Sequence, residues 1–269
     1  MENRLSSQIN QPRPVVLCFS GHDPGGGAGI QADIEAIGAA GGHAATCITA
    51  LTDQDSQRLY SYQSVDPALL KAQADHIIAD FKPVVIKVGM VGSHAILAVI
   101  ADIVRAYPDL ALIIDPVLST GGGAALSESD FVTQLAKQLI PVSTLVTPNS
   151  DELSRLCPGL DQAAGAARLI ESGCSAVLVT GTHLDSDDVV NTLYRQGQPP
   201  LSKRWPRLSG EYHGSGCTLA SYIAGVFAQT RNLEMAVLQG QQYTWDSLGM
   251  ADRLGEGQSI PNRLIRVVK

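Results

Sequence analysis

A cysteine preceded by very small residues is the first feature of this sequence that could do chemistry. Gly214, Ser215 and Gly216 are consecutive, and they lead into Cys217 and an apolar run that favours a helix. Small residues allow successive backbone N–H groups to point at one place at a helix N-terminus, which makes an anion pocket without a basic side chain. A thiol in the first turn would feel the same partial positive charge, so we expect its pKa to fall below about 8.5. The alternative is a buried, small apolar residue, a common role of free cysteines.

A glycine-rich segment, SGHDPGGGAGIQAD at 20–33, is the second candidate. It follows an apolar run and precedes a helical one, and glycine lets backbone N–H groups approach a ligand closely. The segment matches neither the G-x-G-x-x-G fingerprint nor the Walker loop, so the standard dinucleotide and P-loop motifs are excluded. A sharp turn that needs positive φ values is the other interpretation.

Two polar clusters follow apolar runs elsewhere in the chain. Gln54, in 48–56, carries a planar amide with one acceptor and two donors, which suits the edge of an aminopyrimidine, although a lone Gln in a polar loop is more often solvated. Asn149 and Glu152 are three residues apart at the start of a helix, so both side chains share one face beside N–H groups that favour anions. They form a capping box, or their oxygen atoms could hold hydrated Mg²⁺.

The segments around these residues alternate between β-branched runs and helical period, which is typical of a mainly parallel α/β sheet. Strands are expected at 14–20, 43–51, 83–90, 110–117, 144–148 and 175–181, and an antiparallel hairpin at the sheet edge over 189–198 and 201–208. Helices are expected at 29–41, 67–81, 93–107, 127–140, 161–173, 218–229 and 233–252. Ligands of open α/β sheets bind beyond the carboxyl ends of the strands, so the strand-to-helix junctions are the candidate sites.

The composition argues against several classes of protein. The 269 residues carry 19 Lys and Arg against 26 Asp and Glu, a formal charge of −7, and no basic run, which argues against nucleic-acid binding. The five cysteines form no C-x-x-C pair, so neither a disulfide framework nor a zinc knuckle is predicted, and a reducing cytoplasm is expected. No apolar run approaches the roughly 18 residues of a membrane span, and the polar start is unlike a signal peptide. We expect one domain, 1–269, with 1–13 as a flexible segment.

Taken together, the motifs resemble the ribokinase-like superfamily and, within it, the hydroxymethylpyrimidine/phosphomethylpyrimidine kinases of thiamine biosynthesis. GHDPGGGAGIQAD is similar to the family's opening motif, ITALTDQD to its substrate strand, VIKVGM to its K-x-G-M segment and TPNSDE to its N-x-x-E motif. HGSGCTL is the most specific, because most sugar kinases of the superfamily carry Asp where this chain has Cys217. The resemblance implies a three-layer α/β fold with a mainly parallel central sheet, flanked by helices, and a small antiparallel edge.

The resemblance also implies an activity and a set of site residues. The activity is ATP-dependent phosphorylation of 4-amino-5-hydroxymethyl-2-methylpyrimidine and then of its monophosphate to the diphosphate, with Mg²⁺. Backbone N–H groups of 214–217 would stabilise the transferred phosphoryl group, and the Cys217 thiolate would accept the alcohol proton. The implied pyrimidine-binding residues are Asp23, Gly27, Gln54 and Met90, and the implied ATP and Mg²⁺ residues are Asn149, Glu152 (metal through water) and Thr180. A homodimer without nucleic-acid or membrane partners is implied as well.

Two positions depart from the family pattern and keep alternatives open. Thr180 stands where the pyrimidine kinases usually have Lys, and the segment 115–126 is richer in glycine than usual. Pyridoxal kinases often place a hydroxyl residue at the first of these positions, so a pyridoxal or pyridoxine kinase is the alternative. A non-catalytic pyrimidine- or vitamin-binding protein is a third hypothesis, which the intact N-x-x-E and G-S-G-C segments disfavour. Lys87 and His213 are assigned no role in catalysis.

Overall fold

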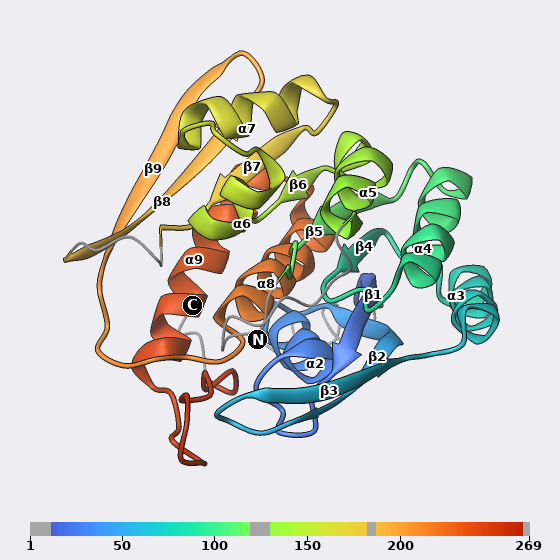
Figure 1. The fold of residues 1–269 in the computed structure, drawn as a ribbon, viewed down its shortest axis with the longest axis horizontal. Coiled ribbons are helices and arrows are strands. Elements are labelled where there is room, and N and C mark those ends of the chain that lie inside the picture. Colours follow the sequence, from blue (N-terminus) through green and yellow to red (C-terminus); the bar gives the residue numbers. More distant parts are fainter. Residues whose placement is uncertain (1–11, 119–129, 182–186, 266–269) are drawn as a thin grey trace, which may run out of the picture.

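The computed structural model describes residues 12–118, 130–181 and 187–265. Within these ranges nine strands form one sheet in the order β3-β2-β1-β4-β5-β6-β7-β8-β9 (Figure 1). The strands are β1 (Val15–His22), β2 (His43–Gln54), β3 (Leu59–Ser64), β4 (Val85–Val88), β5 (Ala111–Ile114), β6 (Leu145–Val146), β7 (Ala176–Val179), β8 (Asp188–Arg195) and β9 (Gln198–Pro206). The helices are α2 (Gly29–Ala39), α3 (Pro67–Phe81), α4 (His94–Ala106), α5 (Phe131–Gln138), α6 (Ser150–Leu156), α7 (Gln162–Glu171), α8 (Ser215–Thr230) and α9 (Leu233–Gly249), with a 3₁₀ turn η1 (Ile140–Val142).

The central strands are parallel, as the apolar runs predict. β2, β1, β4, β5, β6 and β7 pair in parallel, whereas β3, β8 and β9 join antiparallel at the two edges. The chain leaves β1 on one side to form β2 and returns on the other side to form β4. This reversal opens a crevice at the carboxyl ends of β1 and β4, the usual ligand position in open α/β sheets.

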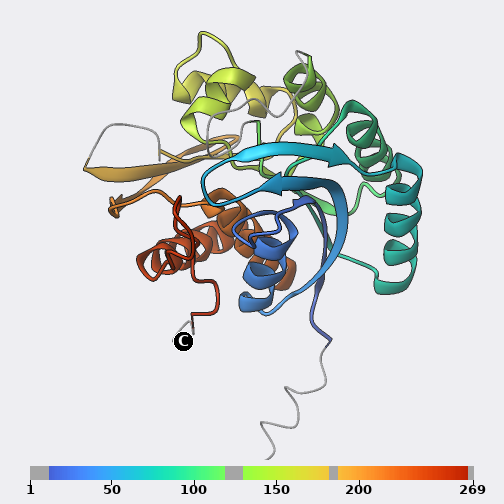
Figure 2. The same cartoon turned by 60° about the horizontal axis from the view of Figure 1, so that its bottom comes forward.

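Helices cover both faces of the sheet, so that its strands are buried on each side. Alternate residues of β1 show this, because Leu17 and Phe19 pack in the cluster beneath α3 and α4 while Val16 and Cys18 pack against α2 and α8. Figure 2 shows the two layers, with α2, α8 and α9 on one side of the sheet and α3, α4, α5 and α7 on the other. The expected three-layer α/β fold, with a mainly parallel central sheet between helical layers and antiparallel edge strands, is confirmed.

The helices start where the sequence supplies caps. Asp66 accepts hydrogen bonds from the first N–H groups of α3, Ser93 does so for α4, and Asp161 for α7. Each cap satisfies one or two of the N–H groups that a helix start leaves without an intrahelical partner. The helical layers are therefore specified locally as well as by their apolar faces.

Several strands are shorter than expected at their ends, and the structure differs more clearly from the sequence-based expectation in two elements. β3 was not expected, because its sequence LYSYQS alternates polar residues at half-exposed positions, and its pairing extends β2 to Gln54 rather than to residue 51. The helix expected at 127–140 starts at Phe131, after which η1 takes Ile140. Residues 1–11 of the expected flexible segment, and 119–126 of the glycine-rich segment, lie outside the described residues.

None of the described helices combines the length and the apolar character needed to cross a membrane.

Candidate active site

A cavity of about 620 Å³ lies at the carboxyl ends of the strands. It brings together residues of β1 and β2, residues that follow β6 and β7, and the N-terminus of α8, which are far apart in the sequence. Of the expected site residues, the cavity is lined by Asp23, Gln54, Met90, Asn149, Glu152, Thr180, Gly214, Ser215, Gly216 and Cys217. Gly27 does not line it, but packs behind His213.

The turn before α8 has a backbone conformation that requires glycine. Gly214 is the N-cap of α8 with φ +85°, in the left-handed region that L side chains rarely adopt. A Cβ there would also overlap the carbonyl oxygen of Gly27 and stand 2.9 Å from Arg263 Nη2. The glycine loop and the start of α8 therefore touch each other at backbone level. This contact leaves the first amides of α8 at the cavity wall, where they favour an anion.

Asp23 organises the glycine-rich loop from within. Its two carboxylate oxygens accept hydrogen bonds from the backbone N–H groups of Gly25 and Ala28, both at 2.8 Å, and Oδ2 also pairs with His213 Nε2 at 2.9 Å. Burial opposes ionisation of Asp23, but the hydrogen bonds and charge of His213 and the two amides lower its pKa. His213, which had no assigned role, thus joins this loop to the turn that precedes α8 and lines the cavity.

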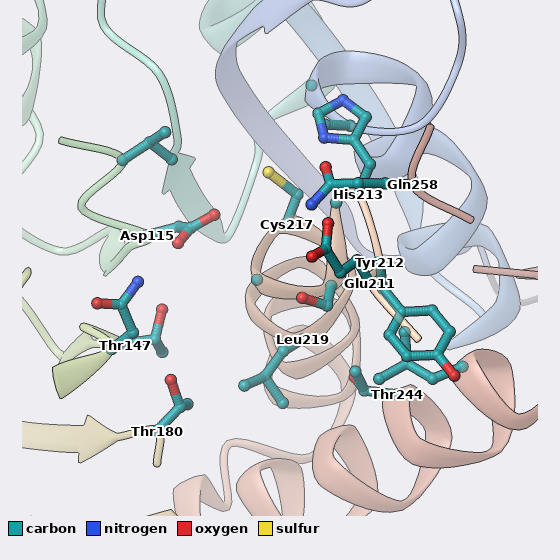
Figure 3. Close-up of a pocket in the computed structure, with 18 of the residues that line it drawn as sticks. Asp115, Thr147, Thr180, Glu211, Tyr212, His213, Cys217, Leu219, Thr244 and Gln258 are labelled. Carbon is teal, nitrogen blue, oxygen red and sulfur yellow. The ribbon is translucent and has the colours of Figure 1, made fainter. Parts of the chain in front are cut away.

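Cys217 lies at the meeting point of two helix starts. Its thiol lies beside the carboxylate of Asp115 and near Gly29, the first residue of α2. Figure 3 shows Cys217 and Asp115 facing each other across the cavity. Burial and then the negative charge of Asp115 raise the pKa of the thiol to about 12. The expected fall in the thiol pKa is therefore wrong for the ligand-free protein, because the carboxylate and burial outweigh the helix dipole.

A buried ion pair lies beneath the thiol. Lys87 of β4 and Asp33 of α2 are fully buried, with Lys87 Nζ 2.7 Å from Asp33 Oδ1 and 3.1 Å from Ser20 Oγ. Burial disfavours the ammonium charge, but Asp33 and the neighbouring Cys217 and Asp115 raise the pKa of Lys87. Lys87 is thus a permanent cation below the site. It is not a packing residue at a strand edge.

Asn149 and Glu152 form the expected capping box at the start of α6. Glu152 N–H donates to Asn149 Oδ1 at 2.8 Å, and Asn149 N–H donates to Glu152 Oε2 at 2.9 Å. Burial, and next the charge of Asp115, raise the pKa of Glu152 to about 8. Among the described residues, Asp115 Oδ2 is buried and has no hydrogen-bond partner. The carboxyl groups of Asp115 and Glu152 are therefore both buried beside the cavity. The positive charge around them does not offset the cost of ionising them, so the pKa of each is raised.

The carboxylate pair fits a divalent cation by its chemistry, because Mg²⁺ takes oxygen ligands and usually keeps several waters. No group of three or more His, Cys, Asp or Glu side chains is placed to bind a metal directly in the part of the chain that the structure describes. Thr180 lies at the end of β7, where its N–H donates to Pro148 O at 3.0 Å and its side chain faces the same end of the cavity (Figure 3).

Gln54 and Met90 line another part of the cavity. Gln54 ends β2, and Met90 follows β4, with its backbone oxygen accepting a short 2.5 Å hydrogen bond from Thr49 Oγ1. Met90 Sδ would stand 3.0 Å from a Cβ at Gly21, so the thioether packs directly on the end of β1. An amide and a flexible, polarisable thioether therefore share the part of the cavity formed by the ends of β1, β2 and β4.

Sequence comparison identifies the relatives of this chain. Residues 23–262 match the phosphomethylpyrimidine kinase family model. The hydroxymethylpyrimidine/phosphomethylpyrimidine kinase of Rhizobium meliloti is 34% identical over 251 residues, which cover 91% of this chain and 94% of the relative. The thiamine biosynthesis bifunctional protein ThiED of Geobacter sulfurreducens is 35% identical over 94% of this chain, and the match spans 53% of that longer protein.

Structural comparison agrees. The crystal structure of phosphomethylpyrimidine kinase from Clostridium difficile superimposes with a TM-score of 0.75 at 28% identity, covering 87% of this chain and 99% of that one. An ADP complex of Bacillus subtilis pyridoxal kinase gives a TM-score of 0.85 at 22% identity, with 93% and 97% of the two chains covered, which shows the same fold. Fold, motif order and sequence identity agree, and the chain belongs to the phosphomethylpyrimidine kinase family of ribokinase-like phosphotransferases.

Proposed function

We propose that this protein transfers the γ-phosphoryl group of ATP to the hydroxymethyl oxygen of 4-amino-5-hydroxymethyl-2-methylpyrimidine, and then phosphorylates the monophosphate to the diphosphate. One observation carries the proposal: a single cavity joins Gln54 and Met90 to Asn149, Glu152 and Thr180, with the N-terminus of α8 also in its wall. The names of the relatives in thiamine biosynthesis support the same reaction.

The amide of Gln54 is the recognition element for the pyrimidine. Its carbonyl oxygen can accept from the 4-amino group, and its NH₂ can donate to an adjacent ring nitrogen, because both partners lie in one plane. Met90 supplies an apolar surface for the ring, and the loop held by Asp23 closes the remaining side. The hydroxymethyl group is thereby directed at the start of α8.

The backbone amides from Gly214 to Cys217 perform the main catalytic task. Phosphoryl transfer depends mostly on positioning and on neutralising charge as it develops, with little covalent work for the protein. The amides are fixed in place by the contact between Gly214 and Gly27, so they need no rearrangement when the phosphoryl group arrives. Removing a comparable preorganised donor costs about 10² to 10³ in rate.

The substrate proton moves to the Cys217 and Asp115 pair. Burial raises the pKa of Asp115, so this carboxylate is a better proton acceptor than an exposed Asp. As the alcohol O–H bond breaks, the proton would go to the Cys217 sulfur while the thiol proton goes to the neighbouring Asp115 carboxylate. The alcohol proton leaves late in a loose transition state, so this transfer does not require a free thiolate beforehand.

The fit of Mg²⁺ rests on Asn149, Glu152 and the unpartnered oxygen of Asp115. When bound, Mg²⁺ would neutralise charge on the ATP phosphates. Glu152 would hold it through water in its ionised form, and Asn149 keeps Glu152 in place through the capping box. Thr180 would donate its hydroxyl to a phosphate oxygen at the same end of the cavity.

The free thiols also bear on where the protein works. All five cysteines are unpaired, and Cys217 needs its thiol, which suits a reducing cytoplasm. We include a homodimer in the proposal, with the β3 edge as the contact, because β3 carries the exposed Tyr60. Light scattering on the purified protein tests the dimer, and a monomer at micromolar concentration would contradict it.

The experiment is a coupled assay of ADP release with the pyrimidine alcohol, its monophosphate, and pyridoxal, each with Mg²⁺ and ATP. We expect turnover with the pyrimidine alcohol and with its monophosphate. Turnover of the alcohol alone would reduce the function to a one-step kinase. Absence of turnover with every acceptor, together with tight pyrimidine binding by calorimetry, would instead show the non-catalytic binding protein.

Pyridoxal kinase is the second candidate, and Thr180 is the observation that favours it. A hydroxyl at the end of β7 replaces the lysine that is usual in the pyrimidine kinases, and pyridoxal offers a similar hydroxymethyl group on a heteroaromatic ring. The same assay separates the two. A value of kcat/KM for pyridoxal above that for the pyrimidine alcohol would transfer the assignment.

A further inference from the structure

The side chain of Arg263 is buried and makes hydrogen bonds to three parts of the chain. Its exposed fraction is 2%. Nε donates to Thr218 Oγ1 at 2.8 Å, and Nη1 donates to Gly26 O at 3.2 Å and to Glu35 Oε2 at 3.1 Å. Nη2 donates to Gly27 O. One guanidinium thus binds the glycine loop, the first turn of α8 and the outer face of α2.

These partners are the two walls that meet at Gly214. Thr218 Oγ1, which accepts from Arg263 Nε, itself donates to Gly214 O at 2.8 Å. Gly27 O, which accepts from Nη2, is the oxygen that a Cβ on Gly214 would overlap. Arg263 therefore fixes both sides of the backbone contact that sets the direction of the first α8 amides.

The backbone of Arg263 is held as firmly as its side chain. Tyr243 Oη donates to Arg263 O at 2.6 Å, and Ser247 Oγ donates to Asn262 O at 2.8 Å. Asn262 N–H in turn donates to Ser247 O at 3.0 Å. These bonds fasten the segment after α9 to α9 itself, so the guanidinium has a fixed origin.

The same segment also fastens the neighbouring loops of the cavity. Ser259 exchanges backbone hydrogen bonds with both Glu211 and His213, each at 2.9 Å, and Gln258 N–H donates to Ser56 O at 2.9 Å. The segment after α9 therefore holds both the turn before α8 and the β2–β3 connection in place relative to α9. Arg263 is the largest fully buried side chain of this segment.

The chemistry of these contacts suits arginine and no other residue. Its donors form a rigid planar fork that can serve several acceptors at fixed angles, and its charge is permanent. Lysine offers three donors on one atom and cannot span Thr218, Gly27 and Glu35 together. The side chain does not line the cavity, so it touches neither substrate nor nucleotide.

We propose that Arg263 is a positioning residue of this kinase, which holds the glycine loop and the α8 amide turn in register so that the amides meet the transferred phosphoryl group. The proposal rests on the kinase activity proposed above. It predicts that loss of the guanidinium lowers kcat with little effect on KM for the pyrimidine, because Gln54 and Met90 lie on other elements.

The test compares Arg263→Ala and Arg263→Lys in the full chain with Arg195→Ala, a matched control whose guanidinium pairs with Glu234 away from the site. A displaced positioning group of about 1 Å costs roughly 10²-fold in rate. We expect a kcat loss of about 10²-fold for Arg263→Ala and about tenfold for Arg263→Lys. Added guanidinium at non-denaturing concentration should restore at least about a tenth of the lost kcat to Arg263→Ala and nothing to Arg195→Ala.

Each outcome decides between the two proposals. An inactive wild type would overturn the proposed kinase activity and, with it, the positioning role of Arg263 that depends on this activity. An active wild type with Arg263→Ala and Arg263→Lys within twofold in kcat would overturn the positioning role. A lower melting temperature of Arg263→Ala with an unchanged kcat per folded molecule would also overturn the positioning role, because this is the result expected for a residue that only stabilises the fold. Should Arg263→Ala not fold, Arg263→Lys gives the same decision through its split between kcat and KM.

Discussion

Replacing Gly214 by alanine disturbs the amide turn without removing any functional group. The backbone at Gly214 has φ +85°. An added Cβ would lie more than about 1 Å closer to the carbonyl oxygen of Gly27 than the 3.0 Å that real Cβ atoms keep from other atoms. The turn or the glycine loop must therefore move. A displacement of about 1 Å costs roughly 10²-fold in rate, equivalent to about 2.7 kcal/mol of transition-state stabilisation. We expect kcat of Gly214→Ala to fall by about 10²-fold or more.

Gly159→Ala is the matched control for this change. Gly159 has φ +79°, close to that of Gly214, but a Cβ there meets nothing within 4 Å. It carries the same backbone strain, about 1 to 2 kcal/mol, without the collision. Both variants should lose melting temperature, and only Gly214→Ala should lose kcat in the coupled assay. The reasoning would be refuted by a folded Gly214→Ala that keeps kcat within about threefold of the control.

Four further changes test separate parts of the site. Cys217→Ala should lower kcat by about 10² to 10⁴ with little change in pyrimidine affinity, and near-wild-type kcat would remove the thiol from the mechanism. Burial raises the thiol pKa most, and the Asp115 charge adds to it, so Asp115→Asn should lower this pKa in part. Alkylation of Cys217 by iodoacetamide, followed by mass spectrometry, should then be faster at pH 8 than in the wild type, and an equal or slower rate would contradict the contribution of Asp115. The pKa of Glu152 is about 8, so the affinity for Mg²⁺ and ADP should rise with pH up to about 8 with proton release, and calorimetry should show this dependence flattened in Glu152→Gln; an equally steep dependence in that variant would exclude Glu152. Gln54→Leu should raise KM for the pyrimidine by about tenfold at nearly constant kcat, the value of a lost hydrogen bond, and an unchanged KM would place the ring elsewhere.

The sign of the Glu152 prediction follows from proton linkage. Its folded pKa is raised from 4.5 to about 8, so the free protein binds more protons than the unfolded chain between these values. The stabilisation is complete below about pH 4.5 and is lost as the pH rises to about 8. A cation bound beside the Glu152 carboxylate lowers the pKa of this group, because the cation favours the ionised form. Binding and stability should therefore respond to pH in opposite directions over this range.

The fold was largely predictable because its central strands are short and apolar, and because the segments between them have apolar residues at helical spacing. β1, β4 and β7 are buried on both faces, and that burial is visible in the sequence as uninterrupted apolar runs. β3 was missed because an edge strand buries only part of one face, and its alternation of polar residues resembles a loop. The hairpin of β8 and β9 was found through the Gly and Pro residues between its arms.

The site was predictable as four motifs but not as a set of contacts. The Asp23 and His213 pair joins residues 190 positions apart, and no local pattern indicates such a bond. Arg263 is similar, because an Arg in a polar segment near the end of the sequence looks like a solvated surface residue until its burial is known. The direction of the Cys217 pKa shift was mistaken for the same reason. The helix start is visible in the sequence, whereas the burial of the thiol and the proximity of Asp115, which follows β5, are set by the fold.

A crystal structure with the pyrimidine alcohol, Mg²⁺ and a non-hydrolysable ATP analogue is the most direct measurement of the central claim. The account predicts γ-phosphoryl oxygens about 3 Å from the amide nitrogens of Ser215 to Cys217, with the hydroxymethyl oxygen in line on the other side. A nucleotide whose terminal phosphate binds elsewhere, with these amides turned toward protein or solvent, would contradict it.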